Sequence, residues 1–319
     1  MDSTQLWTLT DGHAGNRRQA EALAGALGLG PAQDWLLQPR LPWSVSAPRN
    51  FAGAQHAFGT DFAAALEHPP RLAIGCGRQA ALATRLLRAC GSKAVQVLDP
   101  RIDTRHWDLV IAPGHDGLRG DNVISSMGSL NPVDDLWLAR ARLDSPQLAT
   151  LPSPHTVLLV GGPTRHAALG DAGFLTLLRD LRARARSEGG SFSAVASRRT
   201  PARWRDAMVE DDPSLPGVRW RDERDGPNPY ASLLARADRL VCTPDSVNML
   251  SEAAATLAPV FVWSTGIASG RLRLFLDALR SSGRVRDLDD ALAPFAVEPL
   301  RETMRIADEV KRRLGLDIG

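Results

Sequence analysis

The sequence predicts an α/β fold of two Rossmann-like lobes, whose parallel sheets face an interlobe cleft. Short apolar runs typical of buried strands alternate with amphipathic helical patterns along most of the chain. Glycine-bearing or polar turns follow the strand ends in both halves of the chain. A length of 319 residues also fits two domains.

The first lobe is expected over residues 1–145. Its first strand, Leu6–Thr10, leads into a glycine-bearing turn that contains Asp11, Gly12, His13 and Gly15. Asn16 is a good N-cap for the helix that follows, with Gln19 as its capping-box partner. A glycine turn between a first strand and a first helix lets the backbone approach a ligand closely, although the pattern is not GxGxxG.

Later strands of the first lobe end in similar turns. Residues 72–74 are followed by Gly75 and Gly77, and residues 109–112 by His115 and Asp116. Open α/β sheets bind ligands beyond the carboxyl ends of their strands. Because His13 lies in such a turn with Asp11 two residues before it, it is the best general-base candidate, with His115 second. A histidine in a turn also fits a purely hydrogen-bonding surface role.

The second lobe is expected over residues 155–300, after a proline-containing boundary at 141–155. Its first strand, 156–160, runs into Gly161 and Gly162. A second strand, 192–196, runs into Arg198 and Arg199. Two arginines at a strand end can neutralise a diphosphate, and they equally fit an ordinary surface pair in so arginine-rich a chain. All six glycines of these turns are expected to face the cleft.

The stretch 240–263 predicts a strand, turn, helix and strand around which the second lobe is organised. Asp245 is expected to cap the helix, while Asp245, Asn248 and Glu252 form a polar stripe opposite the apolar side. A helix that begins at a strand end favours a phosphate, which Ser246 and the free N–H groups would meet. The stripe fits a ligand site and a solvated helix face equally well.

Composition excludes several classes of function. Two of the 38 basic residues are lysines, Lys93 and Lys311, and the remaining 36 arginines are spread without a basic block. Nucleic acid is therefore not an expected partner. Three widely spaced cysteines predict reduced thiols and no metal site. The sequence has no signal peptide and no transmembrane segment, so a cytoplasmic protein is expected.

Seven segments in order resemble the bacterial members of the mitochondrial-fission ELM family: LTDGHAGNRRQA, GCGRQA, VQVLDPR, GGPT, SRRTP, NPY and TPDSVNMLSEA. The resemblance implies the glycosyltransferase-B architecture, with a nucleotide-sugar held mainly by the C-terminal lobe. It puts Glu252 at the place of the ribose-binding carboxylate, and Arg198 and Arg199 near the diphosphate. It also implies that the last helix, within 301–319, crosses back to the N-terminal lobe.

Three classes of function follow. The first is a glycosyltransferase that takes a nucleotide-sugar as substrate and needs no cofactor. Its acceptor is unidentified, and a molecule at the membrane surface is one candidate. The second is a sugar-nucleotide epimerase or hydrolase on the same architecture, which needs two opposed acid/base groups. The third is a binding or scaffold protein that retains the cleft without the chemistry.

Overall fold

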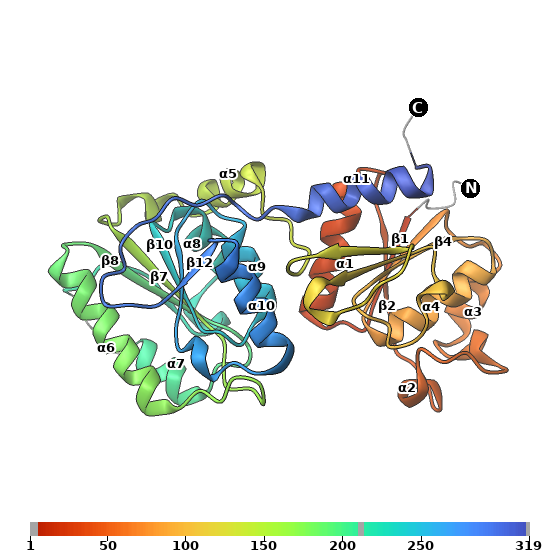
Figure 1. Cartoon of the computed structure of the whole chain (residues 1–319), viewed down its shortest axis with the longest axis horizontal. Coiled ribbons are helices and arrows are strands. Elements are labelled where there is room, and N and C mark those ends of the chain that lie inside the picture. The colour runs from red at the N-terminus through yellow and green to blue at the C-terminus, as the bar shows by residue number, and fades with distance from the viewer. Residues whose placement is uncertain (1–5, 210–213, 317–319) are drawn as a thin grey trace. The chain divides into compact units, whose positions relative to one another are not determined.

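The computed structural model describes residues 6–209 and 214–316 and divides the chain into two compact units (Figure 1). The first comprises Met1–Pro132 and Glu302–Gly319, and the second Val133–Arg301. Each unit contains one six-stranded sheet in which every strand pair is parallel. The predicted α/β fold with two Rossmann-like lobes is confirmed.

The sheet of the first unit has the order β2-β1-β3-β4-β5-β6. Its strands are β1 (Leu6–Thr10), β2 (Gln33–Leu36), β3 (Leu72–Cys76), β4 (Lys93–Val97), β5 (Leu109–Pro113) and β6 (Val123–Ser126). The helices of this unit are α1 (Ala14–Leu27), α2 (Trp43–Ser46), α3 (Thr60–Ala65), α4 (Arg78–Ala89) and α11 (Glu302–Leu314).

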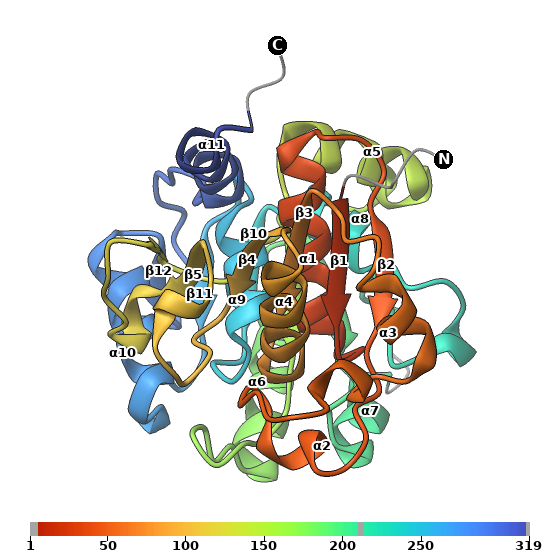
Figure 2. The same ribbon diagram turned by 90° about the vertical axis from the view of Figure 1, so that its right-hand side faces the viewer.

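Both faces of this sheet are covered, which explains why its central strands β1, β3 and β5 are largely apolar and fully buried. Leu6 and Ile74 pack with α1 and α11, whereas Trp7 and Leu9 point to the other face and pack with α3 and α4. Figure 2 shows α4 running along its face of the sheet. Residues 302–316, including the buried Val310, thus complete the core of the first unit.

The sheet of the second unit has the order β12-β11-β10-β7-β8-β9. Its strands are β7 (His155–Val160), β8 (Ser191–Ala196), β9 (Arg219–Trp220), β10 (Arg239–Cys242), β11 (Val260–Val262) and β12 (Val285–Asp287). Its helices are α5 (Asp135–Asp144), α6 (Asp171–Ser187), α7 (Ala202–Met208), α8 (Tyr230–Arg236), α9 (Val247–Ala254) and α10 (Gly270–Ser281).

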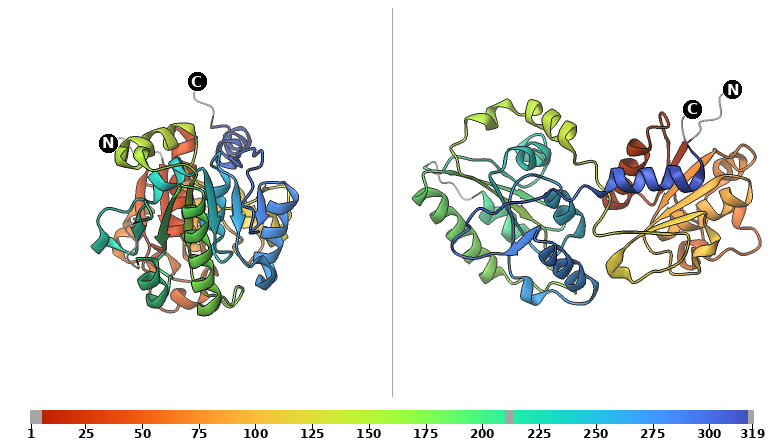
Figure 3. Two further views of the ribbon diagram at one scale, coloured as in Figure 1. Left: turned by 90° about the vertical axis from the view of Figure 1, so that its left-hand side faces the viewer. Right: turned by 45° about the horizontal axis from the view of Figure 1, so that its top comes forward.

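Helices α6 and α7 cover one face of this second sheet, where Phe174 and Trp204 stack with ring centroids 4.0 Å apart. The long helix α6 is green in the left panel of Figure 3. Figure 1 shows α9 and α10 on the other side of the sheet. The helices that follow the neighbouring strands β7 and β10 therefore leave toward opposite faces, which determines where a ligand site can form.

The boundary between the units lies earlier than the expected segment 141–155. Helix α5 packs on α8, where the Ser232 hydroxyl donates to the Ala141 carbonyl over 2.7 Å and Arg142 Nε donates to the Ala235 carbonyl over 2.8 Å. Residues 133–145 consequently belong to the second unit. The proline-containing segment is a connection within that unit, not a boundary.

Candidate functional site

Each sheet contains one topological switch point, where consecutive helices leave toward opposite faces. In the second unit β8 lies on one side of β7 and β10 on the other, and in the first unit β2 and β3 flank β1 in the same way. Such a point opens a crevice beyond the carboxyl ends of the two central strands. The glycine turns after β1, β3 and β7, and the turn after β10, lie at these two switch points.

The buried side chain of Asp245 organises the switch point of the second unit. Its carboxylate accepts hydrogen bonds from the Thr243 hydroxyl (2.7 Å), the Gly162 N–H (3.1 Å) and Arg199 Nη2 (2.7 Å). None of the Asp245 side chain is exposed. A buried carboxylate is tolerated because these donors and the guanidinium charge compensate its desolvation. Asp245 therefore connects the loops that follow β7, β8 and β10.

Gly161 and Gly162 are required by close approach of neighbouring atoms. A Cβ on Gly161 would lie 2.2 Å from both carboxylate oxygens of Asp245, and one on Gly162 would lie 2.3 Å from the Arg199 carbonyl oxygen. Their N–H groups donate to the Thr243 hydroxyl and to Asp245. The absence of side chains at these two positions therefore lets the loops after β7, β8 and β10 pack closely at the switch point.

The start of α9 differs from the expected one. Ser246, not Asp245, is the N-cap, and its hydroxyl accepts from the Met249 N–H over 3.4 Å. Asp245 cannot act as the cap because its carboxylate is turned into the network with Gly162 and Arg199. The helix still begins at the carboxyl end of β10, so its first N–H groups, which have no partner within the helix, lie at the switch point.

The expected polar stripe on α9 is only partly exposed. Asn248 is half-buried, but Glu252 is 3% exposed and accepts a hydrogen bond of 2.5 Å from the Tyr230 hydroxyl at the start of α8. The interpretation of Glu252 as a solvated residue is therefore wrong. In the sequence Tyr230 stands only within the NPY segment, and no local pattern reveals that it contacts a residue 22 positions later.

Arg198 and Arg199 lie in the loop after β8, and they differ in their contacts. Arg199 is half exposed and is held by Asp245, while the exposed Arg198 receives a bond from Arg205 Nη2 at its backbone carbonyl. The hydroxyl of Thr200 fixes this loop to the Gly161 carbonyl over 2.7 Å. Both guanidinium groups thus project from a loop that is anchored at the switch point.

The switch point of the first unit is more open. Asp11 accepts from Asn16 Nδ2 (3.0 Å) and from the His13 N–H (3.1 Å), and its Oδ2 lies 4.0 Å from His13 Nε2. The His13 side chain is 81% exposed. Gly77, with φ of +92°, lies so close to Asn16 that a Cβ would be 2.6 Å from Asn16 Nδ2. The turns after β1 and β3 therefore meet around an aspartate and an accessible imidazole.

Two expectations about the first turn are wrong. Helix α1 begins at Ala14 with His13 as N-cap, so Asn16 and Gly15 lie inside the helix. Asn16 bonds to Asp11 with its side chain, and the Gln19 side chain donates to the Gly15 carbonyl (3.3 Å), so neither forms the expected capping box. Gly12 does lie in the turn, in a left-handed conformation with φ of +79° that favours glycine.

His115 is not brought together with His13. It lies in a 3₁₀ turn, Gly114–Asp116, directly after β5. Strand β5 is three positions away from β1 in the sheet, a separation of roughly 14 Å at the usual strand spacing. Both histidines follow the carboxyl ends of strands in one sheet, but the separation of those strands is unfavourable for action on one atom.

The structure gives no chemistry to the cysteines. Cys76 and Cys242 are buried and Cys90 is exposed, and all three are free thiols. Burial raises the pKa of both buried thiols, which makes them poor nucleophiles. Within residues 6–209 and 214–316, no group of three His, Cys, Asp or Glu side chains is placed to hold a metal ion.

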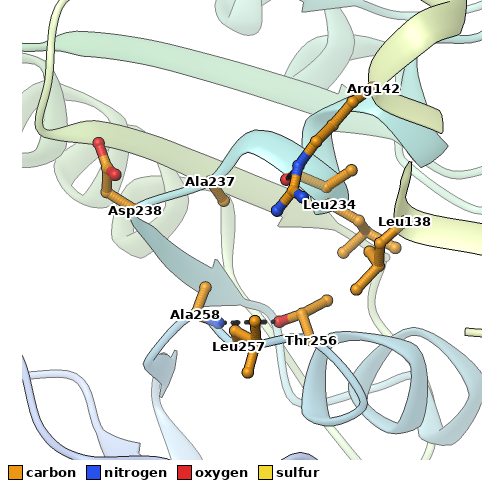
Figure 4. Close-up of a pocket in the computed structure, with 9 residues that line it drawn as sticks. Leu138, Arg142, Leu234, Ala237, Asp238, Thr256, Leu257 and Ala258 are labelled. Atoms are coloured by element: carbon orange, nitrogen blue, oxygen red, sulfur yellow. Dashed lines mark hydrogen bonds between the residues drawn. The ribbon is translucent and has the colours of Figure 1, made fainter. Parts of the chain in front are cut away.

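A cavity of about 220 Å³ lies at the other end of the second sheet (Figure 4). Leu138 and Arg142 of α5 line it together with Asp238, which precedes β10, and Leu257 and Ala258, which precede β11. The Asp238 carboxylate is engaged by the His155 N–H (2.6 Å) and the Ser153 hydroxyl (2.8 Å). The cavity is therefore separate from the switch point, which lies at the carboxyl ends of the strands.

Comparison with known families identifies this chain. The family model described as "Mitochondrial fission ELM1" matches residues 14–314. The chain belongs to the mitochondrial fission ELM1 family. The resemblance inferred from the seven sequence segments is thereby confirmed.

Two curated relatives of this ELM1-family chain extend the comparison. "Mitochondrial fission protein ELM1" of Arabidopsis thaliana is 28% identical over 276 residues, which cover 77% of this chain and 64% of the plant protein. The match thus spans less than two thirds of the plant protein's length. "Uncharacterized protein RP120" of Rickettsia prowazekii is 22% identical over 78% of this chain and 81% of its own.

Solved structures show the fold that this family member shares. The UDP-GlcNAc 2-epimerase of Methanocaldococcus jannaschii is similar over 96% of this chain and 99% of its own, with a TM-score of 0.59 and 10% identity. The same enzyme in complex with UDP-GlcNAc and UDP gives a TM-score of 0.51 at 11% identity, with the same coverage of both chains. At such low identity the likeness establishes the glycosyltransferase-B-like fold alone. Within the described residues of this ELM1-family chain, no helix is both long and apolar enough to cross a membrane.

Proposed function

We propose that this ELM1-family protein binds a nucleoside diphosphate, alone or as a nucleotide-sugar, at the switch point of its second unit. The observation that carries the proposal is the convergence of the start of α9 and the Arg198–Arg199 loop at the ends of β10 and β8. Free N–H groups, a helix dipole and guanidinium groups together favour a diphosphate. The UDP and UDP-GlcNAc named for the epimerase complex are ligands of this class.

The contacts of each side chain support a division of roles. Asp245 balances the charge of Arg199, so Arg198 supplies the uncompensated positive charge for the phosphates. Because the N–H groups of Gly161 and Gly162 already have acceptors, Ser246 and the first N–H groups of α9 are the proposed phosphate donors. Tyr230 and Glu252 form the proposed ribose contact, in which a sugar hydroxyl replaces or shares the hydrogen bond between them.

For the reaction we propose sugar transfer with His13 as general base. His13 would remove a proton from the acceptor hydroxyl while the hydroxyl oxygen bonds to the anomeric carbon and the nucleoside diphosphate departs. Asp11, 4.0 Å from His13 Nε2, would orient the imidazole and stabilise its protonated form. An epimerase or hydrolase is the alternative reaction, and the distance of roughly 14 Å between the strands that carry His13 and His115 is unfavourable for using these two as opposed acid and base.

Calorimetric titration with UDP, UDP-GlcNAc and CDP tests the binding. Arg198→Ala should weaken whichever ligand binds by about tenfold or more, because it removes a charge-assisted hydrogen bond. Arg179→Ala is the matched control, since Arg179 is an exposed arginine of α6 paired with the adjacent Asp180. Equal affinities of the two variants would place the diphosphate elsewhere, and no heat with any of the nucleotides would contradict the proposal.

Membership of a family described by mitochondrial fission favours a second candidate, a binding protein without catalysis. Hydrolysis or transfer of the bound nucleotide-sugar distinguishes the two candidates. Turnover that depends on His13 supports the transferase, whereas tight binding with no turnover in wild type and in His13→Ala supports the binding protein.

A further inference from the structure

A short segment of the first unit presents apolar side chains to solvent. Leu41 is 76%, Val45 70% and Phe51 47% exposed, although most large apolar side chains in the described chain are buried. Val45 lies in α2, and Leu41 directly precedes Pro42, the N-cap of that helix. Leu41, Val45 and Phe51 are called the apolar tip below. Figure 1 shows α2 at the periphery of the first unit.

The segment that contains the apolar tip is fixed to the rest of the first unit by hydrogen bonds and packing. Arg78 donates to the Val45 carbonyl over 2.7 Å and to the Ser44 carbonyl over 3.1 Å, and Arg85 donates to the Pro48 carbonyl. Ala47, Ala54 and part of Trp43 pack into the core on the other side. The exposed side chains are therefore fixed outward by the fold.

The charged residues of the segment that contains the apolar tip are all of one sign. Between Asp34 and Asp61 the chain has no acidic residue but contains the exposed Arg40 and Arg49. The acidic side chains that elsewhere pair with arginines are thus absent from this segment. Apolar side chains beside arginines, without carboxylates, match the apolar interior and anionic headgroups of a bilayer surface.

We propose that the apolar tip docks the protein on membranes that contain anionic lipid, with Leu41, Val45 and Phe51 in the headgroup boundary and Arg40 and Arg49 on the phosphates. Arg78, which donates to the Val45 carbonyl of α2, directly follows Gly77, and a Cβ on Gly77 would lie 2.6 Å from Asn16 Nδ2. Helix α2 is therefore anchored next to the turn after β3, which contacts the start of α1. Docking itself does not depend on nucleotide binding or on the proposed transfer.

Vesicle flotation tests the docking. Wild type should float with phosphatidylcholine vesicles that contain phosphatidylglycerol and much less with phosphatidylcholine alone. The triple variant Leu41→Ser, Val45→Ser, Phe51→Ser should lose about tenfold or more in partitioning, because its apolar anchors are gone. The double variant Arg40→Ala, Arg49→Ala should lose about tenfold in partitioning to anionic vesicles and most of the salt sensitivity of that partitioning. The control, Leu143→Ser with Leu274→Ser, removes two exposed leucines of the second unit and should float like wild type.

Three outcomes would overturn the docking proposal. One is no flotation of wild type with anionic vesicles, and another is equal flotation of wild type and the triple variant. The third is a wild-type dimer that the triple variant converts to a monomer without any change in vesicle binding, which would assign the tip to a second copy of the chain. Thermal unfolding of each variant, expected to match wild type because the substituted side chains are exposed, separates these results from misfolding.

Discussion

The two switch points have the same topology but differ in how their aspartates are used. The side chain of Asp245 has no exposed surface and joins the loops after β7, β8 and β10. Asp11 is 17% exposed and bonds only to the turn that contains it and to Asn16 on the next helix. The second switch point is therefore preorganised by long-range contacts, whereas the first is a local turn with an accessible histidine.

This difference suits the two units to different kinds of ligand. A site whose loops are fixed by a buried carboxylate is ready for a ligand of fixed shape, such as a diphosphate, because little ordering remains to be done on binding. An exposed imidazole beside a single carboxylate can accommodate acceptors of different shape. Substitutions should therefore cost stability in the second unit and mainly activity in the first.

The largest effect is expected from Gly161→Ala. Its Cβ would lie 2.2 Å from both Asp245 oxygens, so the carboxylate must move and its three hydrogen bonds must break. We expect a loss of about 3–5 kcal/mol in the free energy of unfolding, measured by urea denaturation. Gly25→Ala in the middle of α1 is the control: a Cβ there meets nothing within 4 Å, and a small gain is expected. A Gly161→Ala protein as stable as wild type would show that the second switch point is not rigid.

A smaller but still large effect is expected from Asp245→Ala, compared directly with Asp11→Ala. The first leaves the Gly162 N–H without its acceptor and half-exposed Arg199 without its partner, which should cost about 3 kcal/mol. Asp11→Ala leaves hydrogen-bond donors that water can reach, so it should cost about 1 kcal/mol of stability. It should also lower any turnover that requires His13. Equal stability losses in urea denaturation would contradict the distinction between the two switch points.

The sequence predicted the central strands well because they are short, largely apolar runs buried on both faces, as in Leu6–Thr10 and His155–Val160. It predicted turns at Gly12, Gly77, Gly161 and Gly162, but Gly15 lies inside α1 and Gly75 inside β3. It also did not reveal why the turn residues are glycine. The reason for Gly161 lies in Asp245, 84 positions later, and nothing local distinguishes Asp245 from Ser246 as the N-cap, since both residue types cap helices. The contact between Tyr230 and Glu252 was missed for the same reason.

Glu252→Ala, compared with Tyr230→Phe, tests the proposed ribose contact. Because Glu252 is buried, its truncation should cost about 1–2 kcal/mol of stability as well as about tenfold in nucleotide affinity. Tyr230→Phe removes one hydrogen bond of the pair but keeps the ring, so it should change stability by about 1 kcal/mol. Calorimetry at a temperature where both variants are folded gives the affinities. Wild-type affinity in Glu252→Ala would remove this residue from the proposed site.

The smallest effect is the contribution of His155, in the second unit, to the pH dependence of stability. His155 begins β7, is buried, and its Nε2 lies 2.8 Å from the Ser193 hydroxyl oxygen. Burial lowers the pKa of His155, against smaller opposing effects of a backbone hydrogen bond with Arg236 and the charge of Asp238. His155 is therefore protonated at a lower pH in the folded protein than in the unfolded chain, where its imidazole has the ordinary pKa of about 6.5.

The sign of that dependence follows from proton binding. As the pH falls through about 6.5 the unfolded state gains protons first, so the free energy of unfolding decreases until the lower pKa of folded His155 is reached. Glu188, whose pKa is lowered by its hydrogen bond with Arg239, loses its stabilising charge only below about pH 4.5 and does not contribute in this window. His155→Gln should therefore flatten the profile of urea midpoints between about pH 7.5 and 5.5. A slope unchanged by His155→Gln would mean that another group causes it.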